Sequence, residues 1–465
     1  MSVTPLPQPQ NNHPSRRRFI ATSLAAGAAL ALARSRLVRA AETAPEGRKL
    51  RVALVGIGNR GNDLVKAFRD TGLVEFTAFA DVDLQGAHTA ETRQLFPDVP
   101  GFQDFREMFE KAGDRFEAVI VATPDFTHVV VAMHAMRAGK HVYVEKPLAH
   151  TFAEVEMLMA QAAKSGVVTQ MGNQGHSGNN YHQFKAWQEA GIIADVTRVD
   201  MFMNSPRRWH GWQVDGFPSG EPVPPTLNWD LWHAHKPVHP FSPRLHPGDW
   251  RGWFAYGNGA FGDWGPHILD TCHRFLELGL PHTIEAVKRE GANDFIFPQA
   301  TTIRFDFAAR RGMPPVEVFW YDGVENRPPL PPEMGEGAKL ERKNGKFIYS
   351  RKLTFLGGTH SETLRIVPEE KMRELAPTLP KIKGGFSDHF QNFALACLGR
   401  EETKSPFHIS GPLTQVFLLG VIAQHLGGKL EFDPVAKRFT NHARANELLA
   451  DRIPPRAGWE GYFKA

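Results

Sequence analysis

The sequence has only two cysteines among its 465 residues, Cys272 and Cys397. A small disulfide-rich scaffold is therefore excluded, because such scaffolds use several bridges to compensate for a small core. Both cysteines stand in apolar segments of helical pattern, DTCHRFL and ALACLGR, without the spacing of metal ligands. We predict that they are buried core residues rather than a disulfide pair.

Internal repeats and long low-complexity tracts are also missing. With 42% hydrophobic and 22% charged residues, the composition is that of a globular protein, which excludes disordered and fibrous classes. A chain of 465 residues is too long for one ordinary domain. Two or three domains are expected, each with its own core.

The body of the chain has no excess of positive charge. The formal net charge is +4, but residues 1–40 hold six arginines and no acidic residue, which leaves 4 − 6 = −2 for the rest. A weakly acidic body without a basic stripe does not match a phosphate backbone. No nucleic-acid partner is expected.

Residues 1–40 have the pattern of an export leader. Ser15, three arginines and Phe19 precede the apolar run ATSLAAGAALALA, and small residues surround Ala40. The paired arginines resemble a twin-arginine signal, which implies the twin-arginine export machinery and a periplasmic or cell-envelope location. The apolar run is shorter than the roughly 20 residues that span a bilayer, so no stable membrane span is expected. An uncleaved leader stays open.

Residues 50–61 predict a dinucleotide-binding turn. The apolar run LRVALVG indicates a strand buried on both faces, and it leads into Gly56-Ile57-Gly58-Asn59-Arg60-Gly61 and a helical pattern. The first glycine permits a tight turn, the second allows the pyrophosphate to approach, and the third allows the helix to pack on the strand.

Asp81 follows a second predicted strand, residues 74–80, twenty positions after Gly61. An acidic side chain there accepts hydrogen bonds from a ribose diol and repels a 2′-phosphate, so NAD is favoured over NADP. Arg60 is near enough in sequence to weaken this preference. Further strands are predicted at residues 118–124, 141–147 and 167–172, with helices between them. Residues 48–172 therefore predict an α/β Rossmann domain with a doubly wound parallel sheet.

Three later motifs carry a family resemblance. They are Ala122-Thr123-Pro124 with His128, Gly139-Lys140-His141, and Glu145-Lys146-Pro147. From them the chain is similar to the glucose-fructose oxidoreductase, inositol dehydrogenase and rhizopine-catabolism family, Gfo/Idh/MocA. The resemblance implies that Lys146 lies at the nicotinamide end of the cleft and that the Lys146–Pro147 bond is often cis. The expected cofactor-binding residues are Gly56, Gly58, Asn59, Arg60, Gly61, Asp81, Thr123, Pro124, His128, Glu145 and Lys146.

The segment GDWGPHILD contains a second motif of that family, in which Asp263 and His267 line the substrate pocket. The two residues are four apart, so they share one face of a helix. Oxidising a secondary alcohol needs a group that takes the hydroxyl proton, and histidine does this near neutral pH. We expect His267 as general acid/base, Lys146 as polarising group or alternative proton carrier, and Asp263 as orienting group, with a helix-capping role for Asp263 also open.

Residues 204–258 form a segment rich in tryptophan, proline and glycine, which indicates an ordered insertion over the cleft. Its aromatic rings either stack on sugar faces or hold an irregular loop together. Expected substrate-binding residues are Asn173, Gln174, His176 and Trp264. The insertion's histidines 233, 235, 239 and 246 lack a recognised ligand spacing, so no metal site is expected.

Beyond residue 280, alternating β-branched patterns predict a sheet, followed by helices near residues 386–400 and 411–427. Residues 173–465 are thus expected to form an α+β substrate-binding and oligomerisation domain with a large, mostly antiparallel sheet. The resemblance implies a homo-oligomer. Asp388 and His389 are interpreted as structural.

Together these observations predict an exported NAD(H)-dependent oxidoreductase with a tightly retained cofactor. It is expected to act on a secondary hydroxyl or ketone group of a sugar, glycoside or cyclitol. One alternative is an NAD-dependent glycosidase that cleaves glycosides through transient oxidation. A second alternative is a sugar-binding protein without catalysis, which the presence of Lys146, Asp263 and His267 disfavours.

Overall fold

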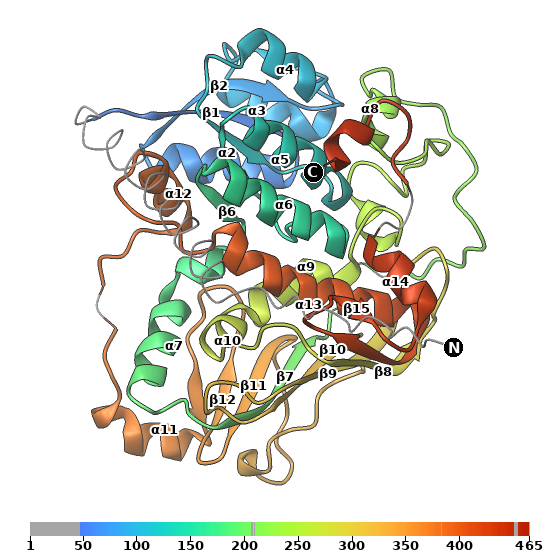
Figure 1. Ribbon diagram of the computed structural model, residues 1–465. Helices are drawn as coiled ribbons and strands as arrows, with labels where there is room; N and C mark the ends of the chain where they lie inside the picture. The colour runs from blue at the N-terminus through green and yellow to red at the C-terminus, as the bar shows by residue number, and fades with distance from the viewer. Residues whose placement is uncertain (1–46, 206–207, 209, 383, 451–453, 465) are drawn as a thin grey trace, which may run out of the picture.

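The computed structural model describes residues 47–205, 208, 210–382, 384–450 and 454–464. Two sheets lie in separate layers, and helices α9 (Gly259–Ile268) and α13 (Phe407–Leu426) lie between them (Figure 1). This arrangement confirms the predicted fold class, an N-terminal Rossmann domain and a C-terminal domain with a mostly antiparallel sheet. The leader expected at residues 1–40 lies outside the described residues.

The first sheet has six parallel strands in the order β3-β2-β1-β4-β5-β6. Helices cover both of its faces, so β1 is buried at five of six positions and β4 at all four. The strand order changes direction between β1 and β4, where open α/β sheets bind their ligands. The strands are β1 (Leu50–Val55), β2 (Val74–Ala80), β3 (Gly101–Phe102), β4 (Ala118–Val121), β5 (His141–Val144) and β6 (Thr169–Met171).

Five helices of the first domain pack on this sheet. The last of them begins with a capping box, in which the Thr151 and Glu154 side chains satisfy free backbone N–H groups. The helices are α2 (Arg60–Asp70), α3 (Ala90–Leu95), α4 (Phe105–Ala112), α5 (His128–Arg137) and α6 (Phe152–Ser165).

Two segments from the end of the chain complete this domain. Helix α12 (His389–Cys397) places Phe393 in the same apolar core as Phe68 of α2 and Tyr143 of β5. The short turn η7 (Glu460–Phe463) lies against α5, where the Tyr462 hydroxyl is 3.1 Å from Nδ1 of His134. The first domain is therefore not continuous in sequence.

The second sheet has nine strands in the order β13-β12-β11-β7-β10-β9-β8-β14-β15. Every neighbouring pair is antiparallel except β7 and β10. The strands are β7 (Val196–Met203), β8 (Thr283–Glu290), β9 (Ala300–Phe307), β10 (Val316–Asp322), β11 (Asn344–Ser350), β12 (Thr354–Gly357), β13 (Arg365–Val367), β14 (Gly428–Asp433) and β15 (Arg438–Phe439). Associated helices are α7 (Asn179–Glu189), α10 (Asp270–Phe275), α11 (Glu369–Leu375) and α14 (Ala443–Ala450).

Helices α9 (Gly259–Ile268) and α13 (Phe407–Leu426) cross each other between the two sheets. A Cβ atom on Gly265 of α9 would lie 2.7 Å from Cε1 of Phe417 on α13, so the close crossing depends on this glycine. In the described part of the chain, α13 is the one helix long and apolar enough to cross a membrane, but 78% of its apolar window is buried in the protein. Its apolar character is thus that of a core helix.

The insertion expected at residues 204–258 has little regular structure. Its described residues, 204–205, 208 and 210–258, contain one short helix, α8 (Trp229–His233), and one 3-10 turn, η4 (Asp249–Gly252). Trp229, Trp232, Trp250 and Trp253 are buried in a cluster with Phe126 of the first domain. These rings hold the irregular loop together and attach it to the Rossmann domain.

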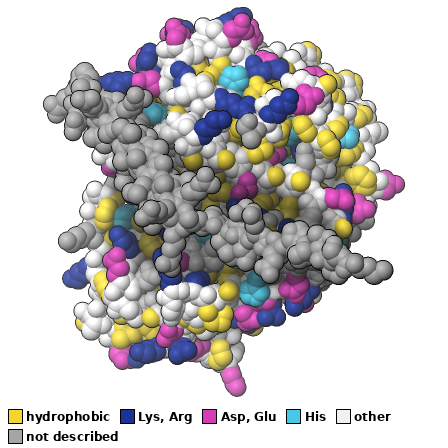
Figure 2. All heavy atoms as spheres, in the orientation of Figure 1, with side chains coloured by type: hydrophobic (Ala, Val, Ile, Leu, Met, Phe, Trp, Pro, Cys, Tyr) yellow, Lys and Arg dark blue, Asp and Glu magenta, His cyan; other side chains and the backbone are white. Residues whose placement is uncertain are grey.

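Both cysteines are free, as the sequence predicts. Cys272 is buried as expected, whereas Cys397 is only partly buried. On the face drawn in Figure 2, acidic and basic side chains are interspersed across the surface.

Candidate active site

The glycine turn lines a cavity at the carboxyl ends of β1, β2 and β4. Gly56 has φ of +86°, and a Cβ atom there would lie 2.8 Å from the Ala122 backbone, so the turn requires glycine. Gly58, Asn59, Arg60, Asp81, Thr123 and Pro124 line the same cavity. The tight turn at a helix N-terminus fits a dinucleotide pyrophosphate.

Asp81 lies at the end of β2 with both carboxylate oxygens held by backbone groups. Ile57 N–H donates to Oδ2 at 2.9 Å, and Asp83 N–H donates to Oδ1 at 3.0 Å. These bonds fix the carboxylate at the mouth of the glycine turn. Asp81 also lines the cavity, and a carboxylate at the end of β2 repels a 2′-phosphate, which favours NAD over NADP.

The opposite wall of the cavity comes from the insertion and the C-terminal tail. Trp232, His246, Trp250 and Arg251 line it, together with Trp459 of the tail. The Arg251 guanidinium lies 4.2 Å from the ring centre of Trp250. A ligand in this cavity would be enclosed by segments more than a hundred residues apart in sequence.

Lys146 and Asp263 meet across the domain boundary. Lys146 follows β5, its bond to Pro147 is cis as the resemblance implies, and its Nζ donates to Asp263 Oδ1 at 2.5 Å. Arg208 of the insertion donates to Asp263 Oδ2 from Nε at 2.9 Å and from its terminal nitrogen at 2.5 Å. Burial alone would raise the pKa of Asp263, but Lys146, Arg208 and Arg251 outweigh it and hold that pKa well below its usual range.

His267 lies one turn after Asp263 on α9, on the same helix face, as the spacing predicts. Burial, Lys146 and His360 together hold the pKa of its imidazole well below the usual value, so the ring is neutral at pH 7. Its Nδ1 has no hydrogen-bond partner among the described residues. The His360 ring stacks on it at a centroid distance of 4.0 Å, and Trp264 meets both rings edge-on.

The segment after β6 is largely buried. Asn173 accepts a hydrogen bond from Ser405 Oγ at 2.6 Å, and its amide donates to Asp270 Oδ2 at 3.4 Å. His176 Nδ1 lies 3.5 Å from the same Asp270 oxygen. These contacts link the end of β6 to α10, while Gln174 and Trp264 are only half-buried. Trp264 is the predicted substrate residue that lies against His267.

Three other expected cofactor residues make contacts within the protein. His128 is buried, with its ring nitrogens 2.9 Å from the carbonyl oxygens of Pro147 and Thr123. It thereby connects the turns after β4 and β5. Arg60 Nε donates to Glu145 Oε1 at 3.0 Å, which joins the glycine turn to the strand end before Lys146.

His389, interpreted as structural, lies 2.8 Å from the Met171 carbonyl oxygen and 2.7 Å from Ser177 Oγ. It is buried, and burial lowers its pKa to about 3. These contacts hold α12 against the end of β6.

The sequence analysis missed two residues of the site. Arg208 stands in an irregular loop, and His360 stands in a turn after β12 with φ of +56°. No periodicity or spacing marks either of them.

The glycine turn, Asp81 and the buried Lys146–Asp263–His267 group define a class, the two-domain dinucleotide-binding oxidoreductases. The chain belongs to one family of that class, the Gfo/Idh/MocA oxidoreductases. Residues 50–173 match the family's NAD-binding Rossmann fold, and residues 181–294 match its C-terminal alpha/beta domain. The cofactor is therefore NAD.

Curated relatives match over part of their length. Inositol 2-dehydrogenase 1 of Saccharopolyspora erythraea is 33% identical over 165 residues, which is 35% of this chain and 48% of that protein. The alpha-N-acetylgalactosaminidase of Shewanella oneidensis is 32% identical over 129 residues, which is 26% of this chain and 28% of that protein. The chain thus spans less than half the length of these relatives.

Solved structures share the fold across most of the chain. The WlbA dehydrogenase of Chromobacterium violaceum, solved with NADH and UDP-GlcNAcA, has a TM-score of 0.55 at 15% identity and covers 83% of this chain and 96% of its own. The aldose-aldose oxidoreductase of Caulobacter crescentus has a TM-score of 0.53 at 16% identity and covers 83% of this chain and all of its own. At these identities the likeness establishes the fold alone.

Proposed function

We propose that this protein is an exported NAD(H)-dependent oxidoreductase acting on a secondary hydroxyl or ketone of a sugar, glycoside or cyclitol. The observation that carries this proposal is the contact of Lys146 with Asp263, one helical turn from His267. It places an ammonium, a carboxylate and a neutral imidazole together, beside the strand ends where the Rossmann sheet binds its dinucleotide.

Bound NAD supplies the hydride acceptor or donor of the reaction. The neutral His267 accepts the proton of the substrate hydroxyl during oxidation and returns it during reduction. Lys146 stabilises negative charge on the same oxygen, because its ammonium is held in a largely buried site. Asp263 stays ionised and fixes the position of Lys146, and Arg208 forms an ion pair with the other oxygen of the same carboxylate.

A retained cofactor is supported by the cavity wall. The insertion and the tail enclose the glycine turn, and Arg456 ties the two together with hydrogen bonds to Asp230 and to the Ala234 carbonyl. Export is supported by the twin-arginine pattern at residues 16–19. An exported enzyme has no soluble pool of NAD to draw on, so we propose that the cofactor is recycled within the site by a second substrate or an electron-transfer partner.

The decisive experiment is mass spectrometry, native and denaturing, on protein purified from the periplasm. One NAD or NADH per chain, on a chain that begins near Ala41, supports a self-contained exported enzyme. A panel of sugars and cyclitols is then tested for reduction of the bound cofactor by absorbance. A protein that carries no dinucleotide and gains none from added NAD contradicts the proposal and favours a sugar-binding protein.

A second candidate function is glycoside cleavage through transient oxidation. It is favoured by the sequence matches to the alpha-N-acetylgalactosaminidase and to proteins of glycosyl hydrolase family 109. The same three residues would serve it, because the first step is again removal of a hydroxyl proton and a hydride. Nitrophenyl glycosides separate the two, since only a glycosidase releases the phenol without net reduction of NAD.

A further inference from the structure

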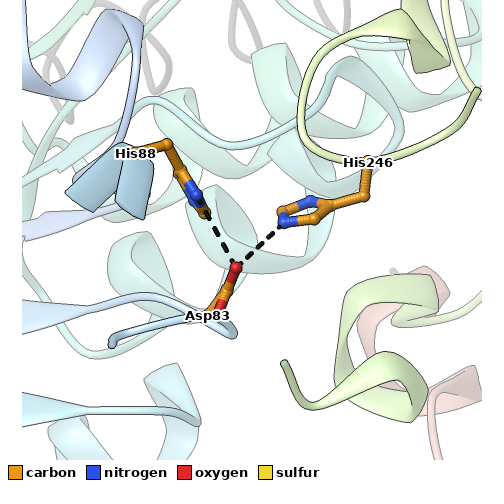
Figure 3. Close-up of side chains that lie close together, drawn as sticks. All are labelled: Asp83, His88 and His246. Atoms are coloured by element: carbon orange, nitrogen blue, oxygen red, sulfur yellow. Dashed lines mark hydrogen bonds and ion pairs between the residues drawn. The ribbon is translucent and has the colours of Figure 1, made fainter. Parts of the chain in front are cut away.

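Three side chains with metal-binding atoms converge beside the cavity that His88 and His246 line: Asp83, His88 and His246 (Figure 3). Their ligand atoms all lie within 4.8 Å of one another. Asp83 and His88 come from the loop after β2, and His246 comes from the insertion. Within the described residues, no other three histidine, cysteine or acidic side chains approach in this way.

The separations match those of a tetrahedral zinc site. Asp83 Oδ2 lies 3.3 Å from His246 Nε2 and 3.6 Å from His88 Nδ1. Zinc–nitrogen and zinc–oxygen bonds of about 2.0–2.2 Å at tetrahedral angles place neighbouring ligand atoms about 3.3–3.5 Å apart. The His88 and His246 rings meet edge-on at a centroid distance of 5.1 Å. A small rotation of these rings would bring all three ligand atoms to the separations of a tetrahedral site.

The surroundings also suit a metal. Asp83 Oδ1 is buried and has no hydrogen-bond partner among the described residues, so this carboxylate has unused acceptor capacity. The other ring nitrogen of His88, Nε2, lies 3.9 Å from Asp81 Oδ1. A carboxylate behind a ligating histidine is the usual arrangement that orients the ring and fixes its tautomer.

We propose that Asp83, His88 and His246 bind one zinc ion that fastens the insertion to the Rossmann domain. Two imidazoles and one carboxylate suit zinc, and three protein ligands leave a fourth position for water. No metal site was predicted from the sequence, because the spacing of the insertion's histidines relative to one another matches no known ligand pattern. The structure instead pairs one of them, His246, with two residues more than 150 positions earlier.

The test is metal binding by the full-length chain as isolated. After dialysis against metal-free buffer, we expect about one zinc per chain by plasma mass spectrometry. Cobalt(II) in place of zinc gives the strong visible absorption of a tetrahedral site. Absence of retained zinc, with a cobalt spectrum like that of the free hydrated ion, overturns the proposal, and neither readout depends on enzymatic activity.

Variants locate the ion. His246→Ala and Asp83→Asn are expected to weaken zinc binding at least 100-fold, as measured by competition with a chromophoric chelator. His239→Ala is the matched control, because His239 lies in the same insertion but stacks on Phe217, and it should retain the zinc. Zinc that stays bound in both ligand variants lies elsewhere and also overturns the proposal. If a variant does not fold, the cobalt spectrum of the unaltered chain decides.

Discussion

Two groups of polar side chains join the insertion to the rest of the protein, and they are built differently. Near the end of β5, Arg208 and Lys146 hold Asp263 by charged hydrogen bonds of 2.5–2.9 Å. Near the end of β2, His246 contacts Asp83 beside His88. In the first group both carboxylate oxygens of Asp263 accept hydrogen bonds, whereas in the second Asp83 Oδ1 has no hydrogen-bond partner among the described residues. The group near β5 therefore fits the proposed reaction with substrate, and the group near β2 fits the proposed binding of a metal ion.

The largest expected effect comes from removing the ammonium near β5. Lys146→Ala should lower kcat by about a thousandfold, because the substrate oxygen loses its polarising group. The measurement is the rate at which the substrate reduces bound NAD. Lys185→Ala, an exposed lysine on α7 paired with Glu189, is the control and should keep full activity. A loss below threefold would contradict the role of Lys146.

The charge balance of the same group can be changed without touching Lys146. Arg208→Ala should lower kcat/KM by about tenfold, because Asp263 Oδ2 loses two charged hydrogen bonds and the buried carboxylate is less well compensated. Arg208→Lys keeps the charge and should recover part of the loss. The control is Arg311→Ala, which changes an exposed arginine. If the two variants have the same kcat/KM, the insertion does not contribute to the group around Asp263.

The pH dependence of oxidation tests the state of His267. Its neutral form is the base, and its folded-state pKa lies well below the ordinary value of about 6.5. Lowering the pH through 6.5 should therefore leave kcat/KM unchanged, with the decline at lower pH where the ring becomes protonated. A decline centred near pH 6.5 would show an unperturbed histidine. The dependence of kcat/KM on pH is measured on the unaltered protein.

The smallest effect is expected where the tail supports the insertion. Arg456→Ala removes hydrogen bonds to Asp230 and Ala234, and should lower the free energy of unfolding by about 1–2 kcal/mol. Release of bound NAD should become a few-fold faster, as followed by dilution into an NAD-scavenging enzyme. Arg444→Ala breaks only an exposed pair with Glu447, so both quantities should remain unchanged.

Sequence reasoning succeeded where function and regular structure coincide. The glycine turn, Asp81 and the Asp263–His267 pair all stand at strand ends or on a helix, where spacing determines direction. Arg208, His360 and His246 stand in irregular segments, where nothing in the spacing shows which way a side chain points. Strand β7 was also missed, because its partners β10 and β11 lie more than a hundred residues further along the chain and its burial does not alternate.

The placement of α12 has a consequence for how the chain acquires its shape. Phe393, Ala394 and Leu398 complete the core around Phe68 and Tyr143, yet they are synthesised more than two hundred residues later. Until then, the part of the Rossmann core that α12 covers beside α2 stays exposed during translation, and exposed apolar surface promotes aggregation. The nucleotide domain reaches its final packing only when nearly the whole chain has left the ribosome, so a fragment ending at residue 172 should expose its apolar surface and need a chaperone to stay dispersed.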